Sequence, residues 1–230
     1  MKKTALLLVL AAIGGYYWLL SRPTLYFSQS VTYKNFTLRS SGDLPVSFEG
    51  ALDRALEKIT AAELYAPDMK FDIYLPGGRR EFHFFAPYQH GDYFRVNPLN
   101  GAIFIAAADF GADQAFTAPG DPEHRRLSSE IAAAAAQAMI WHKVERLKFM
   151  TMEDWLLRGY AQRVSGGAGT FTPADICAAN KADDALQDYE YGLAVESAMR
   201  EGPVSFGELL NSNYSYEGAE KRITKQYCGR

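Results

Sequence analysis

The stretch LSSEIAAAAAQAMIWHKV, residues 127–144, decides the fold, because it is long, poor in charge and built around five consecutive alanines. Alanine is the best helix former, and its small side chain lets another helix or a sheet approach closely. We predict a long helix over residues 122–144, with Glu123 in its first turn. Neighbouring elements are expected to pack against its alanines.

A second piece, DWLLRGYAQRVSGG at residues 154–167, follows the long helix after a short gap. Its pattern predicts a shorter helix over residues 152–165. Gly166 and Gly167 supply the stop, since glycine is the usual residue just past a helix end.

The rest of the chain has strands first and helices later. Apolar residues at three- and four-residue spacing in residues 46–65 predict an amphipathic helix. Residues 70–78 and 101–109 are typical of strands, and residues 23–41 of an extended linker or an edge strand. A further helix is predicted over residues 183–201, followed by a short helical turn and a polar tail. This order indicates the α+β class.

Residues 1–22, MKKTALLLVLAAIGGYYWLLSR, indicate the compartment. Lys2 and Lys3 precede an uncharged run to Leu20 that spans about 26 Å as a helix, at the lower limit for one membrane crossing. We predict a single N-terminal transmembrane helix in the inner (cytoplasmic) membrane, with the main domain on the periplasmic side. A cleaved signal peptide is the alternative, and it also exports the chain.

After this segment we expect a linker over residues 23–47 and one domain over residues 48–230. The net charge of −3 and the pI near 5.8 give no electrostatic reason to expect nucleic acid as a partner. In an oxidising compartment, Cys177 and Cys228 predict one disulfide that ties the C-terminal tail to the body. Two unpaired thiols are the alternative.

The order of four pieces carries a family resemblance. LYAPDMKFDIYLP at residues 64–76 is followed by GAIFIAAAD at 101–109, the long helix, and DWLLRGYAQRVSGG. In this order they resemble the gluzincin metallopeptidases, and more narrowly small bacterial membrane-associated proteins with a gluzincin-like domain. The resemblance covers about residues 48–180 and implies a small sheet plus a helical bundle. In that family the long helix carries H-E-x-x-H, and the next helix a glutamate within W-L-x-E-G-x-A.

The family's motif has a clear chemical purpose. Two histidines and the later glutamate bind zinc, and the glutamate of H-E-x-x-H acts as general base on the zinc-bound water. The resemblance places the first histidine at Ala133, the base at Ala134, the second histidine at Gln137 and the last ligand at Arg158. Alanine has no donor atom, an amide is a feeble zinc ligand, and arginine is a fixed cation. We therefore expect no catalytic residues, no metal and no cofactor at these vestigial positions.

A relocated metal site is an alternative, and the histidines are the residues to consider for it. They are His83, His90, His124 and His142. No two of them have the i, i+4 spacing that places ligands on one helical face, so exposed or locally bonded histidines are the expectation.

The substituted positions suggest a structural role for the arginine. Glu130, Ala133 and Gln137 share one face of the long helix, because they lie three or four residues apart. We predict that Arg158 approaches this face from the second helix and forms an ion pair with Glu130 or a hydrogen bond with Gln137. The alternative is that Arg158 points to solvent.

The resemblance and the substitutions together favour a pseudoenzyme. We expect a membrane-anchored, exported, catalytically inactive protein that acts as a scaffold or accessory subunit, with a groove beside the long helix for a protein or peptide partner. Aromatic residues such as Tyr88, Tyr93 and Phe94 are candidates for contact area. An atypical hydrolase with a relocated site, and a small-molecule or lipid-binding module, are the alternatives.

Overall fold

The computed structural model describes residues 2–87, 93–167, 171–178, 183–201 and 204–229. Within these ranges the chain forms nine α-helices and two β-sheets, which confirms the α+β class. The helices are α1 Lys2–Ser21, α2 Glu49–Thr60, α3 Arg79–Phe85, α4 Leu127–Lys143, α5 Arg146–Met150, α6 Asp154–Ser165, α7 Asp184–Glu201, α8 Phe206–Leu209 and α9 Tyr216–Cys228. The strands are β1 Gln29–Tyr33, β2 Phe36–Ser40, β3 Phe71–Leu75, β4 Phe94–Val96, β5 Ile103–Ile105, β6 Ala107–Asp109, β7 Gln114–Phe116 and β8 Arg125–Arg126.

The larger sheet contains residues that we expected to be a linker or an edge strand. Its strand order is β1-β2-β3-β5-β4, with β2, β3 and β5 parallel and the two outer strands antiparallel to their neighbours. β1 and β2 form a hairpin through Lys34, whose φ is +52°. β1 is an edge strand, but β2 lies inside the sheet, so residues 29–40 belong to the domain. The local sequence pattern did not predict that β2 pairs with the distant strand β3.

The two faces of this sheet contribute to two separate groups of core residues. Alternate side chains of a strand point to opposite faces. Ile73 and Ile103 belong to the main core, which also includes α2 and α4. Tyr74 and Phe104 point the other way and pack with Phe27 in a second, aromatic cluster that includes α3 and the end of α1.

A smaller antiparallel sheet, β6-β7-β8, follows directly on the larger one. The single strand predicted over residues 101–109 is therefore two strands, β5 and β6, in different sheets. The long helix starts at Leu127, later than predicted, because Arg125 and Arg126 are extended and pair with β7.

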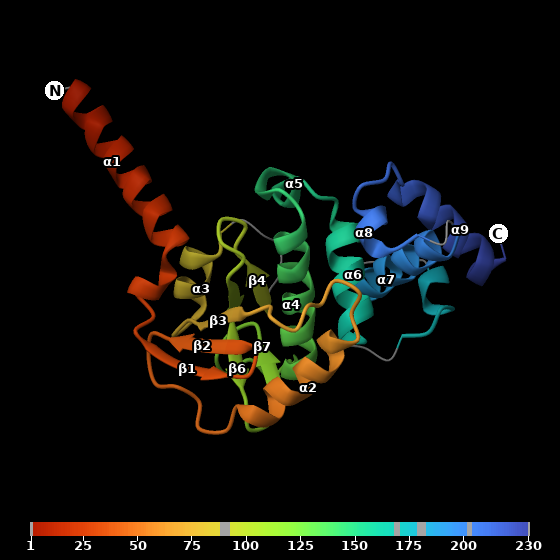
Figure 1. The fold of residues 1–230 in the computed structure, drawn as a ribbon, viewed down its shortest axis with the longest axis horizontal. Coiled ribbons are helices and arrows are strands. Elements are labelled where there is room, and N and C mark those ends of the chain that lie inside the picture. The colour runs from red at the N-terminus through yellow and green to blue at the C-terminus, as the bar shows by residue number, and fades with distance from the viewer. Residues whose placement is uncertain (1, 88–92, 168–170, 179–182, 202–203, 230) are drawn as a thin grey trace.

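Helix α4 is the centre of the molecule (Figure 1), where it lies between the sheets and the C-terminal helices α6 to α9. It packs against α2, α6 and strands of both sheets, and its residues from Leu127 to Ile140 are all buried. A helix enclosed on every side needs an apolar surface all round and small side chains at close approaches. The alanine run meets this requirement, as predicted.

The C-terminal half is helical. α6 ends where predicted, at Gly166, whose φ of +71° is the left-handed conformation that glycine adopts without strain. α7 packs across α6, and α9 packs against α7. The segment that we expected to be a polar tail is the helix α9, which buries Ala219 and Ile223.

The predicted transmembrane helix over residues 1–22 is wrong. Among the described residues, no helix combines the length and the apolar character that a bilayer crossing requires. The last turns of α1 are part of the domain instead: Leu20 is fully buried in the aromatic cluster, and the Tyr16 hydroxyl donates a hydrogen bond of 2.7 Å to the Phe84 carbonyl. The Asn97 amide also donates a hydrogen bond of 3.0 Å to the Leu20 carbonyl.

Candidate functional site

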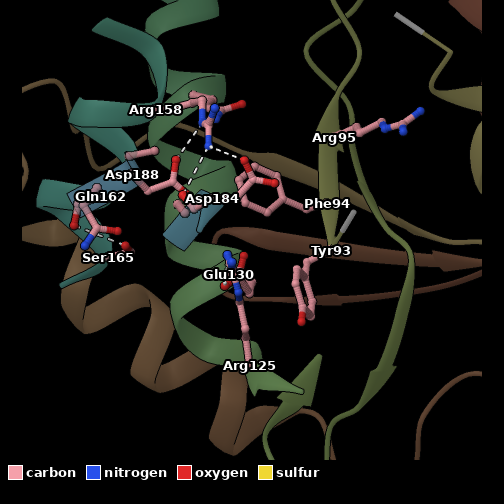
Figure 2. A pocket seen from close by; sticks show the side chains of 13 residues that line it. Tyr93, Phe94, Arg95, Arg125, Glu130, Arg158, Gln162, Ser165, Asp184 and Asp188 are labelled. Carbon is pink, nitrogen blue, oxygen red and sulfur yellow. Dashed lines mark hydrogen bonds and ion pairs between the residues drawn. The ribbon is translucent and has the colours of Figure 1, made fainter. Parts of the chain in front are cut away.

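A cavity of about 270 Å³ lies beside the central helix, between α4, α6, α7 and strand β4 (Figure 2). Its lining is mostly polar, and helices α4, α6 and α7 and strand β8 all contribute charged or amide side chains to it. The lining residues are Tyr93, Phe94, Arg95, Arg125, Glu130, Ala133, Gln137, Arg158, Ala161, Gln162, Ser165, Asp184 and Asp188.

Three of the four vestigial positions meet at this cavity. Ala133, Gln137 and Arg158 line it, whereas Ala134 is fully buried and is not among the lining residues. Glu130 also lines it, so the predicted face of α4 is the face that borders the cavity. Helices α4 and α6 therefore bring these residues to one cavity.

The partners of Arg158 differ from those predicted. Its Nε donates to Asp188 Oδ1 at 2.6 Å, and its Nη2 lies 3.9 Å from Asp184 Oδ1. Its guanidinium also stacks over the Tyr191 ring, 5.4 Å from the centroid. Among the ion pairs of the described residues there is none between Arg158 and Glu130. Arg158 thus connects α6 to α7, because two carboxylates on α7 compete for it.

Burial and pairing oppose each other at this ion pair. Burial raises the pKa of Asp188 above its ordinary value, and Arg158 only partly offsets the rise. Burial acts to lower the pKa of Arg158, but the nearby carboxylates, Asp188 above all, together outweigh it and leave this pKa raised. The contact of 2.6 Å between side chains that are each about one-quarter exposed is that of a charged, hydrogen-bonded pair.

Glu130 has a different partner, Arg125. The nearest atoms, Arg125 Nη1 and Glu130 Oε1, are 3.7 Å apart, which is too long for a hydrogen bond. Arg125 also stacks over the Tyr93 ring at 4.6 Å. Burial raises the pKa of Glu130 to about 7, with Arg125 opposing the rise and Asp188 adding to it. Burial therefore brings the protonation of this carboxyl into the neutral pH range.

Gln137 is the most unusual group at the cavity. Its side chain is 6% exposed, and within the part of the chain that the structure describes its amide makes no hydrogen bond. The amide atoms are not among the fully buried polar atoms without a partner, so they are reached from the cavity. Gln137 therefore has unused capacity to donate and to accept at the wall of the cavity.

Aromatic residues form part of the opposite wall. Tyr93 and Phe94, which we expected to supply contact area, both line the cavity, whereas Tyr88 lies outside the described residues. Figure 2 shows that the side chain of Arg95 points away from the other labelled groups. Its Nη1 donates to the Ala86 carbonyl, and its guanidinium stacks over Phe82.

Several lining residues were not identified from the sequence. Asp184 and Asp188 lie one turn apart on α7, and this i, i+4 carboxylate pair is a signal that the sequence does contain. Its partner was not predictable, because residues 166–183 connect α6 to α7 and so long a connection does not fix which faces meet. Arg125 was expected inside a helix and lies instead in β8.

The residues with metal-binding chemistry are dispersed. His83, His124 and His142 lie on different segments, and His90 is outside the described residues. Among the described residues, no three of His, Cys, Asp and Glu gather closely enough to hold a metal ion.

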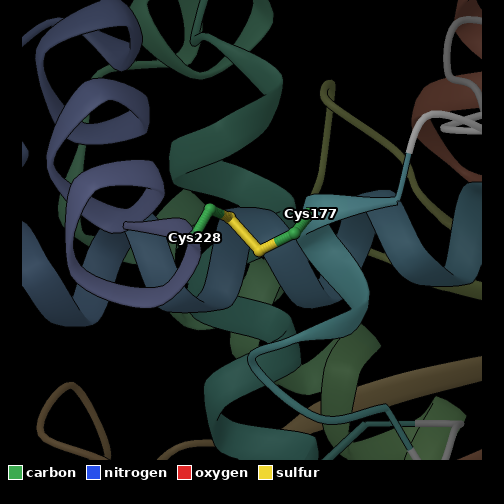
Figure 3. Close-up of a disulfide and its surroundings, with 2 residues drawn as sticks. All are labelled: Cys177 and Cys228. Atoms are coloured by element: carbon green, nitrogen blue, oxygen red, sulfur yellow. A yellow bond between two sulfur atoms is a disulfide. The ribbon is translucent and has the colours of Figure 1, made fainter. Parts of the chain in front are cut away.

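The two cysteines are joined as predicted. Cys177 ends a short 3-10 turn, Asp175–Cys177, and Cys228 is the last residue of α9, and Figure 3 shows the disulfide between them. It connects the end of the chain to the segment between α6 and α7, beyond the cavity.

A second cavity of about 530 Å³ lies at the carboxyl ends of the parallel strands, where Ser40, Leu75 and Ile105 end β2, β3 and β5. Ligands often bind at this edge of a sheet. Its lining is mainly apolar, however, and the Ser40 hydroxyl is already used as an acceptor for the Gly42 amide at 3.1 Å. The cavity beside α4 is the stronger candidate, because it contains buried charged and amide groups.

No protein-family model, curated protein or solved structure matches this chain.

Proposed function

We propose that this protein is a non-catalytic binding protein, in which a gluzincin-like domain has lost its zinc ligands and uses the cavity beside α4 for a short segment of a peptide or protein partner. In this role it acts as a scaffold or accessory subunit. The observation that carries the proposal is the Gln137 amide, which lines the cavity and makes no hydrogen bond to the described residues, although the residue as a whole is 6% exposed.

The chemistry of the wall supports a peptide as ligand. A peptide unit offers one N–H donor and one carbonyl acceptor. Gln137 and a protonated Glu130 each offer both, and Arg125 has donors that its long contact with Glu130 leaves available. Tyr93 and Phe94 add apolar area for side chains.

The residue types support the absence of peptidase chemistry. Ala133 and Ala134 have no donor atom for a metal or for a water molecule, and Arg158 is a cation held by Asp188. Hydrolysis by the mechanism of the resembling family needs a metal-bound water and a base, and none of these three side chains supplies either.

The proposal is tested by titrating the ¹⁵N-labelled protein with a mixed-sequence pool of N-acetylated tripeptide amides. We expect amide resonances of the cavity residues to shift in a saturable manner. Ala133→Leu fills the floor of the cavity and should abolish these shifts. Ala61→Leu, at an exposed position just after α2, adds the same side chain elsewhere and should leave them unchanged.

Three results would contradict the proposal. The first is that no peptide shifts the cavity resonances, and the second is that Ala133→Leu binds peptides as well as the unmodified protein does. The third is stoichiometric bound zinc together with peptide hydrolysis that a chelator stops, which would establish the enzyme alternative.

We also propose that the domain works in an oxidising compartment outside the cytoplasm, with the Cys177–Cys228 disulfide as the supporting observation. Protein isolated from its own cells without reductant should take up a thiol-alkylating reagent only after reduction. Full labelling before reduction would contradict this location.

A further inference from the structure

The charged groups of the cavity largely satisfy one another. Arg158 is paired with Asp188 at 2.6 Å and with Asp184 at 3.9 Å, and Arg125 lies 3.7 Å from Glu130. A carboxylate ligand would have to displace Asp188 to reach Arg158, or approach Arg125 beside the carboxyl of Glu130. A cationic ligand would meet Arg125. A charged ligand of either sign would therefore have to displace one of these groups or lie beside a like charge.

Helix α4 also presents the neutral amide of Gln137, and the carboxyl of Glu130, which is neutral only when it is protonated. Gln137 carries an amide oxygen that accepts and an amide nitrogen that donates. Glu130, with a pKa near 7, presents a carboxyl that both donates and accepts when it is protonated. The two residues are two helical turns apart, about 10 Å along the helix axis, and both face the same cavity.

Ala133 lies between these two groups on the same face of the helix and forms the floor of the cavity. Its side chain ends at Cβ, so the space that a longer residue would occupy is open. A ligand group that enters over Ala133 comes within reach of Gln137 on one side and Glu130 on the other.

We infer that this cavity recognises an uncharged carboxamide group, which pairs with the amide of Gln137 through one donated and one accepted hydrogen bond. This inference rests on the proposed function and specifies the chemistry of its ligand. A carboxamide matches Gln137 in both directions, whereas a carboxylate offers acceptors only. A volume of about 270 Å³ is slightly below the usual range for whole small-molecule ligands, so one such group with its neighbouring atoms fits.

The same chemistry has two sources in a peptide, the backbone peptide unit and the side chain of Asn or Gln. Small probes separate them. N-methylacetamide represents the peptide unit, propionamide represents the side chain, and propionate replaces the amide of propionamide by a carboxylate of the same size.

The experiment is a titration of the full-length protein at pH 7 with each probe, followed by the ¹⁵N resonance of the Gln137 side-chain amide. Fragments of this size bind weakly, so the titrations extend beyond the millimolar range. We expect at least one amide probe to shift this resonance and to bind at least about fivefold more tightly than propionate, as one hydrogen bond implies. The tighter amide identifies the source.

Gln137→Met keeps the length of the side chain and removes the amide. It should lower the affinity for the preferred amide to that for propionate. Gln226→Met, at an exposed position in α9, is the matched control and should change nothing. If Gln137→Met does not fold, the response of the Gln137 side-chain resonance in the unmodified protein to the amides and to propionate still tests the inference.

Propionate binding as tightly as both amides, or no response of the Gln137 resonance to either amide, would overturn the inference. If tripeptide amides bind the cavity under the same conditions, the proposed function stands and only the carboxamide preference fails. If the tripeptides also fail, the proposed function fails with it.

Discussion

Glu130, a buried carboxyl at the cavity, makes the stability of the folded protein depend on pH. Its pKa near 7 lies above the ordinary 4.5, because burial penalises the charged form. The folded protein thus holds this proton more tightly than the unfolded chain does. The resulting stabilisation is complete below about pH 4.5 and is lost as the pH rises through about 7. Asp188, whose pKa is also raised, contributes with the same sign.

Glu130→Gln should remove this pH dependence, since an amide does not ionise. We expect the free energy of unfolding of Glu130→Gln, minus that of the unmodified protein, to increase by at most about 3 kcal/mol as the pH rises from about 4 to about 8. Urea denaturation at a series of pH values measures the difference. The surface substitution Glu217→Gln, at the exposed pair with Lys221, is the control. Parallel stability curves for Glu130→Gln and the unmodified protein would show that the burial of Glu130 has no such consequence.

The packing of α6 against α7 sets the position of the cavity's far wall. A Cβ atom on Gly159 would lie 2.5 Å from the Tyr191 carbonyl oxygen and 2.8 Å from Val195 Cγ2. Only glycine allows this approach, and it brings Arg158, the preceding residue, to Asp188. The close contact between α6 and α7 therefore places the Arg158 side chain beside Asp188 on α7.

Gly159→Ala should destabilise the protein by about 2 kcal/mol, because the backbone of α7 has to move away. Gly50→Ala is the matched control: it lies exposed in α2, where a Cβ would meet only Arg54 Nη1 at 3.5 Å. We expect this control to be neutral or slightly stabilising, since alanine is the better helix former. Thermal and urea unfolding of both variants measure the effects. Equal stability of Gly159→Ala and Gly50→Ala would contradict the close contact.

The whole molecule consists of a sheet-containing half and a helical half, with α4 between them (Figure 1). The cavity lies where the two halves meet. The disulfide constrains the helical half, since Cys177 and Cys228 are separated by 51 positions in the sequence. Closing a loop of this length restricts the unfolded chain and stabilises the folded one by up to about 4 kcal/mol.

The double substitution Cys177→Ser with Cys228→Ser should lower the free energy of unfolding by about 2–4 kcal/mol. Reductant should destabilise the unmodified protein by a similar amount and have no further effect on the double variant, which serves as the control. The same unfolding midpoint for the unmodified protein with and without reductant would contradict a structural role for the disulfide.

Much of the helical framework was predictable from local patterns. Apolar spacing predicted α2, local sequence patterns predicted α6 and α7, the alanine run predicted close neighbours around α4, and Gly166 predicted the end of α6. These features depend on interactions within a few residues along the chain. The hairpin of β1 and β2 and the start of α4 after β8 were not predictable, because both depend on pairing with strands far away in the sequence.

For the site, the amino-acid types alone determined that Ala133, Ala134, Gln137 and Arg158 include no histidine or carboxylate, the zinc ligands of a peptidase of the resembling family, since ligand chemistry belongs to the side chain. The face of α4 shared by Glu130, Ala133 and Gln137 also followed from helical spacing. Tertiary structure decided the rest: that Arg158 pairs with α7, that Arg125 reaches Glu130, that burial raises the pKa of Glu130, and that the last turns of α1 belong to the domain. Distances between segments and the loss of solvent around a group arise only when the chain folds.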